Sequence, residues 1–420
     1  MNVGAMVGAL GSAPIANGMG RRNCLVVSGV IFALGYALLA LCHGFVLLLV
    51  ARIITGVGSG MASFIVPLYI AEVAKTSRRG TLGASNQLAI VVGIFLSYGL
   101  ASWITMDTPS GALPEDYVKH LDEGVDAPTR VCNYQLFSGI IAGIGGLFAA
   151  LCFTVPETPR WLFMKSRTQD GEWALQQLRG DDFFEERQEL QVAANPSANE
   201  SSESMMDYKR QLFIGMMLQV FQQFSGVNNI MFYLTTILDK NGVENPEVYS
   251  TITMLLQIIF TALSCVLMDK AGRRALLMMS MCGLAIGMAC FSSKFLFNVT
   301  GTGGSILSIS AAFVFICSFS MGTGGIPWLI LAELFPTSIR GKASSIAVAT
   351  NWTSSFIITL SFTPLVNLVG EAAGFGFYSL CCVAGIAFVF FYVPETKGKS
   401  LEEIEREMRG GRSTGNTDRV

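Results

Sequence analysis

Hydrophobic residues run through the chain in long uninterrupted stretches. Eleven stretches contain no Asp, Glu, Lys or Arg, and they cover residues 1–20, 23–51, 53–71, 80–106, 131–156, 211–238, 248–268, 275–293, 295–332, 343–370 and 372–394. Each is at least 19 residues long, and about 20 apolar residues cross a bilayer as a helix. Because the stretches are apolar nearly all round, their length decides for helices over strands. The pattern predicts an all-α membrane protein with eleven visible spans.

The composition agrees with a membrane protein. Of the 420 residues, 51% are hydrophobic and 14% are charged, with a mean hydropathy of +0.51, whereas soluble domains carry about 25% charged residues. A net charge of -2 gives no reason to expect a nucleic-acid partner. The ten Cys residues form no CxxC pair and no His–Cys cluster. A disulfide scaffold is therefore excluded, and we expect neither a metal site nor a cofactor.

Basic residues divide the connections between the stretches into two sets. Alternate connections hold 23 of the 28 basic residues, at 21–22, 75–79, 160–210, 270–274, 340–342 and from 397 onward. The other connections hold four, and Arg52 lies inside a span. The positive-inside rule places the basic set and the C-terminal tail in the cytoplasm. We expect a multi-pass protein of the plasma membrane, with Met1 outside.

Two longer segments lie outside the spans. Residues 104–130 form an acidic loop, and residues 157–210 form a linker whose charged part, 172–192, predicts short amphipathic helices. Residues 195–204 have the composition of a flexible linker. The expected division is a first helical half (1–156), the cytoplasmic linker (157–210), a second helical half (211–394) and a cytoplasmic tail (395–420).

Three sequence signatures occur twice, in the same order. They are Gly-Arg-Arg at 20–22 and 272–274; a Pro, a Glu and then Arg-Gly at 67–80 and 327–341; and Pro-Glu-Thr at 156–158 and 394–396. Two parallel half-molecules are implied, as in transporters that rock one half against the other. The second Gly-Arg-Arg follows two spans and the first follows one, so we expect a further helix upstream of Met1.

With these signatures, the chain resembles the sugar porter family of the major facilitator superfamily from Gly4 to about Ser400. The motifs that carry the resemblance are residues 20–22, Arg52 with Gly56, Gly58 and Gly60, residues 67–69, Glu72, residues 79–80, 156–160, 222–228 and 327–328, Glu333, residues 340–341, 351–352 and 394–398. The resemblance implies twelve helices in two six-helix halves, a sugar bound at the bilayer midplane, and alternating access by a monomeric unit.

The function that follows is facilitative transport of a hexose such as glucose or fructose. The alternatives are a proton-coupled sugar symporter, a polyol or disaccharide porter, and a non-transporting sugar sensor; only about 26 residues follow Pro394, which argues against a sensor with a long tail. An enzyme is not expected, because the only His residues are His43 and His120 and no nucleophile is paired with a base.

The resemblance also implies a set of sugar-binding residues. The substrate contacts fall on Gln87, Gln222, Gln223, Asn228, Trp328 and Asn351, with Gln257 and Phe319 as neighbours. The residues themselves fit this role, because amide side chains both donate and accept hydrogen bonds as sugar hydroxyls do, without the desolvation cost of a charge. Gln219, Gln222 and Gln223 share one helix face. Interhelical hydrogen bonding is the alternative role for such residues.

Two sites require an irregular helix. A regular helix would place Asn229 on the face of Gln222, so a contact from Asn228 requires the helix to unwind past Gly226. Trp328 follows Gly322, Gly324, Gly325 and Pro327, which predicts a bend. An indole at a bend can cover the apolar face of a sugar, and a tryptophan at the membrane interface is the alternative.

Repeated charges at the cytoplasmic helix ends predict ion pairs that close the inner side. They are Arg21, Arg22, Glu72, Arg79, Glu157, Arg160, Asp269, Arg273, Arg274, Glu333, Arg340 and Glu395. Arg52, towards the outer half of its span, requires a partner. In proton-coupled relatives that partner is an Asp on the first helix, so protons stay open as a coupling ion. Asn17 stands where the family usually has Asp, whereas the second copy keeps Asp269.

Two glycosylation acceptor sequences are present. Asn298-Val299-Thr300 falls on the outer side, where we expect a glycan on Asn298. Asn199-Glu200-Ser201 falls on the cytoplasmic side and should stay unmodified.

Overall fold

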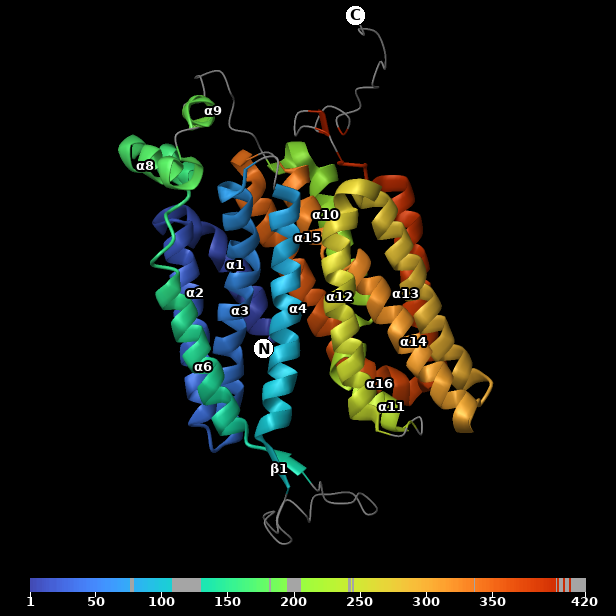
Figure 1. Cartoon of the computed structure of the whole chain (residues 1–420). Coiled ribbons are helices and arrows are strands. Elements are labelled where there is room, and N and C mark those ends of the chain that lie inside the picture. Colours follow the sequence, from blue (N-terminus) through green and yellow to red (C-terminus); the bar gives the residue numbers. More distant parts are fainter. Residues whose placement is uncertain are drawn as a thin grey trace, which may run out of the picture.

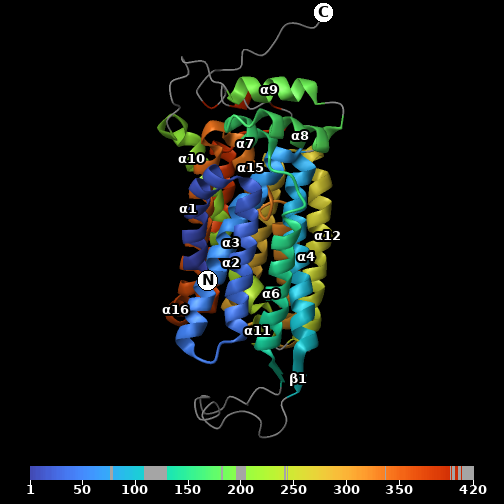
Figure 2. The same ribbon diagram turned by 90° about the vertical axis from the view of Figure 1, so that its left-hand side faces the viewer.

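Two groups of long helices stand side by side, with short helices at one end and a small β-ribbon at the other (Figures 1 and 2). The computed structural model describes residues 1–75, 79–107, 130–180, 183–194, 205–240, 243, 245–335, 337–397, 399, 403–404 and 408. We call the end that carries α7 (Pro159–Met164), α8 (Thr168–Arg179) and α9 (Phe184–Ala194) the linker end. The opposite end carries β1 (Thr105–Asp107) and β2 (Arg130–Cys132), and we call it the hairpin end.

The first group, blue to teal in Figure 1, contains five helices among the described residues. They are α1 (Asn2–Met19), α2 (Arg21–Ala40), α3 (Phe45–Val73), α4 (Arg79–Ile104) and α6 (Tyr134–Leu151). The second group follows the 3₁₀ turn at Met205–Tyr208. It contains α10 (Lys209–Phe224), α11 (Val227–Lys240), α12 (Pro246–Ala271), α13 (Arg273–Leu296), α14 (Gly301–Met321), α15 (Ile326–Leu334) and α16 (Thr337–Tyr392).

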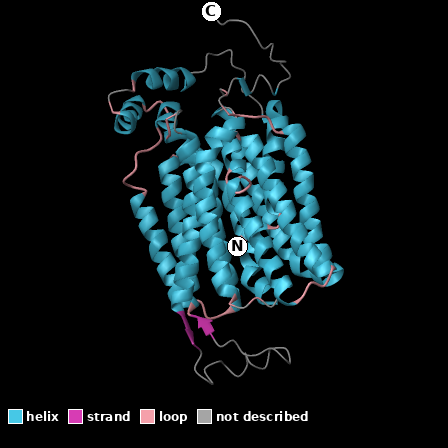
Figure 3. Ribbon diagram, turned by 45° about the vertical axis from the view of Figure 1, so that its right-hand side comes forward, coloured by secondary structure: helices cyan, strands magenta, loops and turns pink. Residues whose placement is uncertain are grey.

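Each charge-free stretch forms helix, so the predicted class is confirmed, and Figure 3 shows helix through nearly all of the described chain. Eight helices of the described residues are long and apolar enough to span a membrane. This number is below eleven because α10 and α11 are short pieces of one stretch, α16 joins two stretches across Gly370 (φ 83°), and α1, rich in Gly and Ala, is not among the eight.

Two details differ from the sequence pattern. The stretch 23–51 does not form one helix, because α2 ends at Ala40 and α3 begins at Phe45, with Arg52 inside α3. A charge interrupts a hydrophobic stretch without ending a helix. The acidic loop begins and ends as an antiparallel ribbon that pairs Thr105 with Cys132 and Asp107 with Arg130. The predicted linker at 195–204 lies outside the described residues, and α9 ends directly before it at Ala194.

Small residues allow close packing inside the first group. A Cβ added to Gly4 would lie 2.1 Å from the Ile53 carbonyl oxygen, and one added to Gly60 would lie 2.0 Å from the Ala5 oxygen. The backbones of α1 and α3 therefore approach as in other membrane helix pairs with small residues at the contact.

The two groups meet along α1 with α16 and along α4 with α12. The Ser345 hydroxyl donates to the Ala9 carbonyl at 2.8 Å, and the Tyr98 hydroxyl donates to the Met231 carbonyl at 2.9 Å. Apolar side chains of both groups also share one buried cluster, which includes Phe64 of α3 and Val348 of α16. These contacts hold the groups together on either side of the polar residues described next.

Candidate functional site

The hydrophobic stretch 211–238 forms two helices, α10 and α11, with a break where the resemblance requires one. α10 ends at Phe224 and α11 begins at Val227, with Gly226 at φ +84° between them. A Cβ at Gly226 would lie 2.8 Å from the Met288 methyl carbon, so both the backbone angle and the packing favour glycine. The unwinding expected past Gly226 is present.

The break decides which asparagine joins the glutamines of α10. The Asn228 amide nitrogen donates to the Gln223 side-chain oxygen at 2.6 Å and to the Ser355 hydroxyl at 2.7 Å. The Asn229 amide nitrogen instead donates to the Tyr378 hydroxyl at 2.9 Å. Asn228, which a regular helix would not have placed here, therefore belongs to the same polar cluster as Gln223.

Asn351 of α16 connects three glutamines of α10. Its amide nitrogen donates to the side-chain oxygens of Gln219 and Gln222, both at 2.7 Å. Its oxygen accepts from the Gln223 amide nitrogen at 3.0 Å. We call Gln219, Gln222, Gln223, Asn228 and Asn351 the amide cluster. Its members are uncharged, and all except the half-buried Asn228 are at most 7% exposed.

A second break lies beside the amide cluster, at Gly322–Gly325 between α14 and α15, as the glycines and Pro327 predict. We call it the α14–α15 junction. The Gln222 amide nitrogen donates to the carbonyl oxygens of Thr323 at 2.7 Å and Gly324 at 3.1 Å. Such a break frees backbone carbonyls, and Gln222 satisfies two of them.

The other predicted residues lie around this junction. Gln87 of α4 contacts it, since a Cβ on Gly325 would lie 3.5 Å from the Gln87 side chain. Phe319 is buried, and its carbonyl accepts from the Gly324 amide at 2.8 Å. Gln257 of α12 is 2% exposed, and its side-chain oxygen has no hydrogen-bond partner among the described residues.

Trp328 lies deeper towards the linker end, between the two groups of helices. Its ring packs against the apolar cores of both groups. It also lines a narrow cleft together with Phe64 and Pro67 of α3 and Leu331 of α15. Trp328 thus lies at the contact between the two groups, on the linker side of the amide cluster. It does not occupy an exposed position at the membrane interface.

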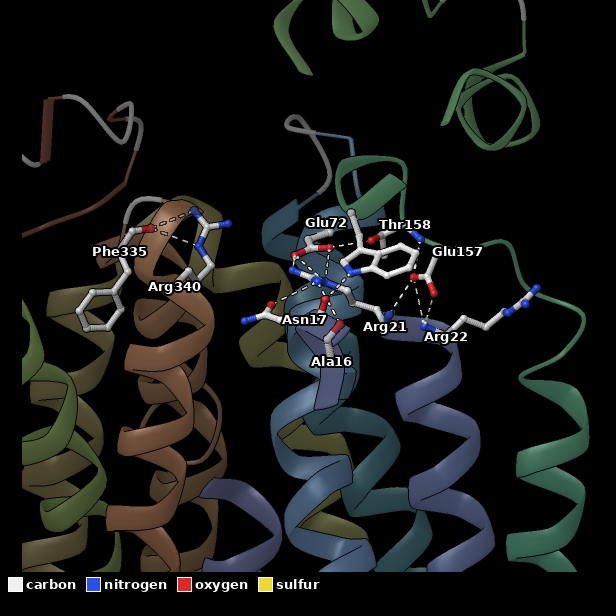
Figure 4. A network of polar contacts seen from close by, with 10 residues as sticks. Ala16, Asn17, Arg21, Arg22, Glu72, Glu157, Thr158, Phe335 and Arg340 are labelled. Atoms are coloured by element: carbon white, nitrogen blue, oxygen red, sulfur yellow. Dashed lines mark hydrogen bonds and ion pairs between the residues drawn. The ribbon is translucent and has the colours of Figure 1, made fainter. Parts of the chain in front are cut away.

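The repeated charges form a compact cluster at the linker end of the first group, shown in Figure 4. The Arg21 guanidinium pairs with Glu72 at 3.0 Å, and these side chains are 6% and 2% exposed. The Thr158 hydroxyl donates to the other oxygen of the Glu72 carboxylate at 2.7 Å. Glu157 accepts the backbone amides of Arg21 at 2.9 Å and Arg22 at 3.1 Å, which caps the positive N-terminus of α2.

The second group repeats these contacts at the matching positions. Arg273 pairs with Glu333 at 3.3 Å, and the Thr396 hydroxyl donates to Glu333 at 2.6 Å. Glu395 accepts the backbone amides of Arg273 at 2.9 Å and Arg274 at 3.1 Å. We refer to these as the first and second ion-pair clusters. Arg21–Glu72 and Arg273–Glu333 are ion pairs between helices, and each lies within one group.

Both turns into these clusters contain a glycine that no other residue can easily replace. Gly20 has φ +101° and Gly272 has φ +89°. A Cβ on Gly20 would lie 2.2 Å from a Glu157 carboxylate oxygen, and one on Gly272 would lie 2.6 Å from a Glu395 oxygen. The glycine of each Gly-Arg-Arg signature thus makes room for the capping glutamate.

Burial affects the acidic groups of both clusters. Burial raises the pKa of Glu157, against the opposing hydrogen bonds from the Thr158, Arg22 and Arg21 amides. Burial likewise raises the pKa of Glu333, against the opposing charge of Arg273. The carboxylates are therefore held in place by their partners at some cost in desolvation.

The remaining predicted residues have varied positions. Arg340 is 2% exposed and donates from Nε and Nη2 to the Phe335 carbonyl, at 3.1 and 3.0 Å (Figure 4). Arg52 is exposed near the hairpin end of α3. Arg160 lies in the first turn of α7. The side chains of Arg79 and Asp269 lie outside the described residues.

Of the two glycosylation candidates, the structure describes one. Asn298 is exposed in the turn between α13 and α14, at the hairpin end. Asn199 lies outside the described residues.

Several contacting residues were not identified from the sequence. Ser355 follows Asn351 by one helical turn, so its face was readable from the spacing. Thr158 and Thr396 stand in the repeated Pro-Glu-Thr signature, which marked the position without showing the bond to Glu72 or Glu333. Arg179 of α8 donates to the Val73 carbonyl at 2.9 Å, a contact that no local sequence pattern predicts.

Comparisons with known proteins agree with this arrangement. The family described as "Sugar (and other) transporter" matches residues 1–408. "Sugar transporter ERD6-like 8" of Arabidopsis thaliana is 36% identical, over 97% of this chain and 83% of that relative. "Facilitated trehalose transporter Tret1" of Aedes aegypti is 32% identical, over 98% of this chain and 49% of that protein. The structure of the proton:xylose symporter XylE bound to 6-bromo-6-deoxy-D-glucose is similar with a TM-score of 0.79 and 27% identity, over 97% of this chain and 87% of that one.

Proposed function

The chain belongs to the sugar transporter family of the major facilitator superfamily, whose members move sugars by alternating access, and we propose that this member carries a monosaccharide such as glucose or fructose. It is a multi-pass membrane transporter and not an enzyme. The amide cluster is the observation that carries the proposal. Neutral amides that converge on two helix breaks from α10, α11 and α16 suit a neutral ligand with many hydroxyls.

The hydrogen bonds inside the cluster define what the sugar must replace. The Asn351 amide nitrogen donates to Gln219 and Gln222, and its oxygen accepts from Gln223. A sugar hydroxyl that enters must exchange with these bonds, so the net gain from each contact is small. Weak binding suits a carrier, because release must be fast. Gln87 and Trp328 would contact the sugar from the linker side.

The ion-pair clusters supply the conformational part of the proposal. We place the linker end in the cytoplasm, because the basic connections lie there. Each cluster ties together helix ends of one group, and Trp328 packs between the groups beside them. The proposed role of the clusters is to favour the state in which the cytoplasmic side is closed.

We propose facilitative transport without a coupling ion. The similarity to a relative named as a facilitated trehalose transporter supports this proposal. Proton symport is the second candidate, supported by the similarity to the proton:xylose symporter and by the position of Arg52 inside α3. A disaccharide is the second candidate substrate, because a relative is named as a trehalose transporter.

Uptake into proteoliposomes tests the proposal. The purified chain should accumulate labelled glucose or fructose to equilibrium at the same rate with and without a pH gradient. Accumulation above equilibrium under an inward proton gradient would establish symport instead. Uptake of labelled trehalose in place of both hexoses would establish a disaccharide carrier.

Substitutions locate the site. Gln222→Ala should raise the half-saturation concentration about five- to thirtyfold, because losing one good hydrogen bond costs about 1 kcal/mol, and more when a buried partner is left unpaired. Gln211→Ala is the matched control, since Gln211 is as buried as Gln222, at 3% exposed each, on the same helix. Equal effects of the two substitutions would show that the amide cluster is structural.

A further inference from the structure

Helix α12 carries a polar face that the proposed site uses only at Gln257. The members of this face are spaced three or four residues apart, so they lie on one side of the helix. They are Ser250, Thr253, Gln257, Thr261 and Ser264, each at most 5% exposed. The other side of α12 exposes Leu255, Ile259 and Leu263, as expected for a helix that faces lipid. The polar face therefore points into the protein.

Most of these side chains have a partner. The Thr253 hydroxyl donates to the Tyr249 carbonyl of its own helix at 2.7 Å, the usual arrangement for a buried helical threonine. The Ser264 hydroxyl donates to the Met321 carbonyl at 2.8 Å. The Thr261 hydroxyl and the Gln257 side-chain oxygen are the exceptions. Both residues are 2% exposed, and neither atom has a hydrogen-bond partner among the described residues.

The bond from Ser264 shows what this face of α12 contacts. Met321 is the last residue of α14, so Ser264 is bound at the edge of the α14–α15 junction. Thr261 precedes Ser264 by three residues, which is about 4.5 Å along the helix towards the hairpin end. From α10, Gln222 donates to carbonyls of the same junction. Thr261 and Gln257 thus approach from α12 the region that the amide cluster approaches from α10.

We propose that Thr261 is a further sugar-contacting residue, which together with Gln257 binds sugar hydroxyls from α12. This inference rests on the proposed function. A threonine hydroxyl donates and accepts, and a glutamine oxygen accepts, so the pair matches one or two neighbouring hydroxyls of a sugar ring. Buried polar groups in native proteins are nearly always hydrogen-bonded. A ligand that brings its own hydroxyls satisfies both atoms at once.

The test compares the same substitution at two buried threonines of one helix face. Thr261→Val and Thr253→Val each remove one hydroxyl, but only the hydroxyl of Thr253 already has a partner. With labelled D-glucose in proteoliposomes, Thr261→Val should raise KM about five- to tenfold with kcat within twofold of the unsubstituted chain. Thr253→Val should change neither by more than twofold. Thr261→Ser, which keeps the hydroxyl, should restore KM.

A second measurement separates binding from packing. Monodeoxy glucoses, used as inhibitors of uptake, should show one ring position at which the unsubstituted chain loses affinity and Thr261→Val loses none. The thermal unfolding midpoint of Thr261→Val in detergent should be unchanged or higher, because an unpaired hydroxyl is removed. A purely structural role predicts a lower midpoint and an unchanged deoxy-sugar pattern.

The outcomes distinguish the two levels of the argument. If the unsubstituted chain takes up none of glucose, fructose and trehalose, the proposed function fails. If it takes up a sugar, and Thr261→Val behaves as Thr253→Val does or lowers kcat alone, the inference about Thr261 fails and the proposed function stands.

Discussion

The two ion-pair clusters at the linker end have the same contacts but different surroundings. In the first, Arg21 and Glu72 are 3.0 Å apart and their side chains are 6% and 2% exposed. In the second, Arg273 and Glu333 are 3.3 Å apart and are 9% and 18% exposed. Because charges attract more strongly when water is excluded, the repeated motif yields a tighter pair in the first group than in the second.

The difference comes from residues outside the repeated signatures. In the first group the Tyr69 hydroxyl donates to the Pro156 carbonyl at 2.7 Å, and the Trp161 ring nitrogen donates to the Asn17 carbonyl at 3.1 Å. Ile330 stands at the position that corresponds to Tyr69 and offers no donor. In the second group an exposed bond from Lys397 to the Lys270 carbonyl takes a similar place. We expect the second cluster to separate more readily when the linker end opens.

Neutralising the glutamate of each cluster should give the largest effect. Glu72→Gln leaves the buried Arg21 guanidinium without a counter-charge, which should destabilise the protein by about 3 kcal/mol. Glu333→Gln should cost about 1.5 kcal/mol, as for a hydrogen bond to a charged group that water can partly replace. Thermal unfolding in detergent, followed by tryptophan fluorescence, should give the lower midpoint for Glu72→Gln.

The order of the two midpoints is the critical result. If Glu333→Gln unfolds at the lower temperature, the exposure of the pair does not set its strength and the comparison is wrong. Glu189→Gln, at an exposed position of α9, serves as the control, and it should shift the midpoint by less than either.

Removing the threonines should have the next largest effect, and the effects should be equal. Thr158 donates to Glu72 at 2.7 Å and Thr396 to Glu333 at 2.6 Å. Both residues are at most 4% exposed, so each Val substitution should cost about 1.5 kcal/mol. Double-mutant cycles with the two Gln variants measure each coupling separately. Unequal coupling energies would place the difference between the clusters in the threonines and not in the arginine pairs.

The sequence predicted the fold well because the signals are long and chemical. Charge-free stretches of bilayer length locate nearly every helix, and Gly226 with the Gly322–Gly325 run marks the two breaks. The residues of the amide cluster came partly from spacing and partly from the family resemblance, which was needed to choose Asn228 over Asn229. That choice depends on one residue's positive φ, which no periodicity reveals.

Other features were not predictable because they depend on contacts between distant segments. α3 begins at Phe45, seven residues before the charge at Arg52 that interrupts the pattern. Nothing local distinguishes Thr261 from Thr253, because both are buried threonines on the same face of one helix. Only the packed structure shows that the Thr253 hydroxyl donates to the Tyr249 carbonyl of its own helix, whereas the Thr261 hydroxyl has no partner among the described residues.

A smaller effect is expected from pH, and it should have the same direction in both clusters. Burial raises the pKa of Glu157 and of Glu333 above the ordinary value of 4.5. A raised pKa means that the folded state binds more protons than the unfolded state, so this contribution to stability is full below pH 4.5 and is lost as the pH rises through the raised value. The unfolding midpoint of the unsubstituted protein should therefore fall relative to that of Glu157→Gln as the pH rises from 4.5. The assigned direction is wrong if the midpoint of the unsubstituted protein instead rises relative to that of Glu157→Gln over this pH range.

The smallest expected effect concerns the position at which the two clusters differ in sequence. Asn17 is exposed, and its side-chain oxygen accepts from the Arg21 Nη1 at 3.4 Å, whereas the second copy has Asp269 at the same offset. Asn17→Asp gives Arg21 a second negative partner, but exposure limits the gain to about 0.5 kcal/mol, roughly a twofold shift in a conformational equilibrium. The shift should favour the state closed at the linker end and change the ratio of exchange to net flux in proteoliposomes. Asp269→Asn should shift that ratio in the opposite sense. If Asn17→Asp leaves transport unchanged in both directions, a second negative partner for Arg21 adds nothing to the pair with Glu72. The two clusters then differ in their packing and not in their charge.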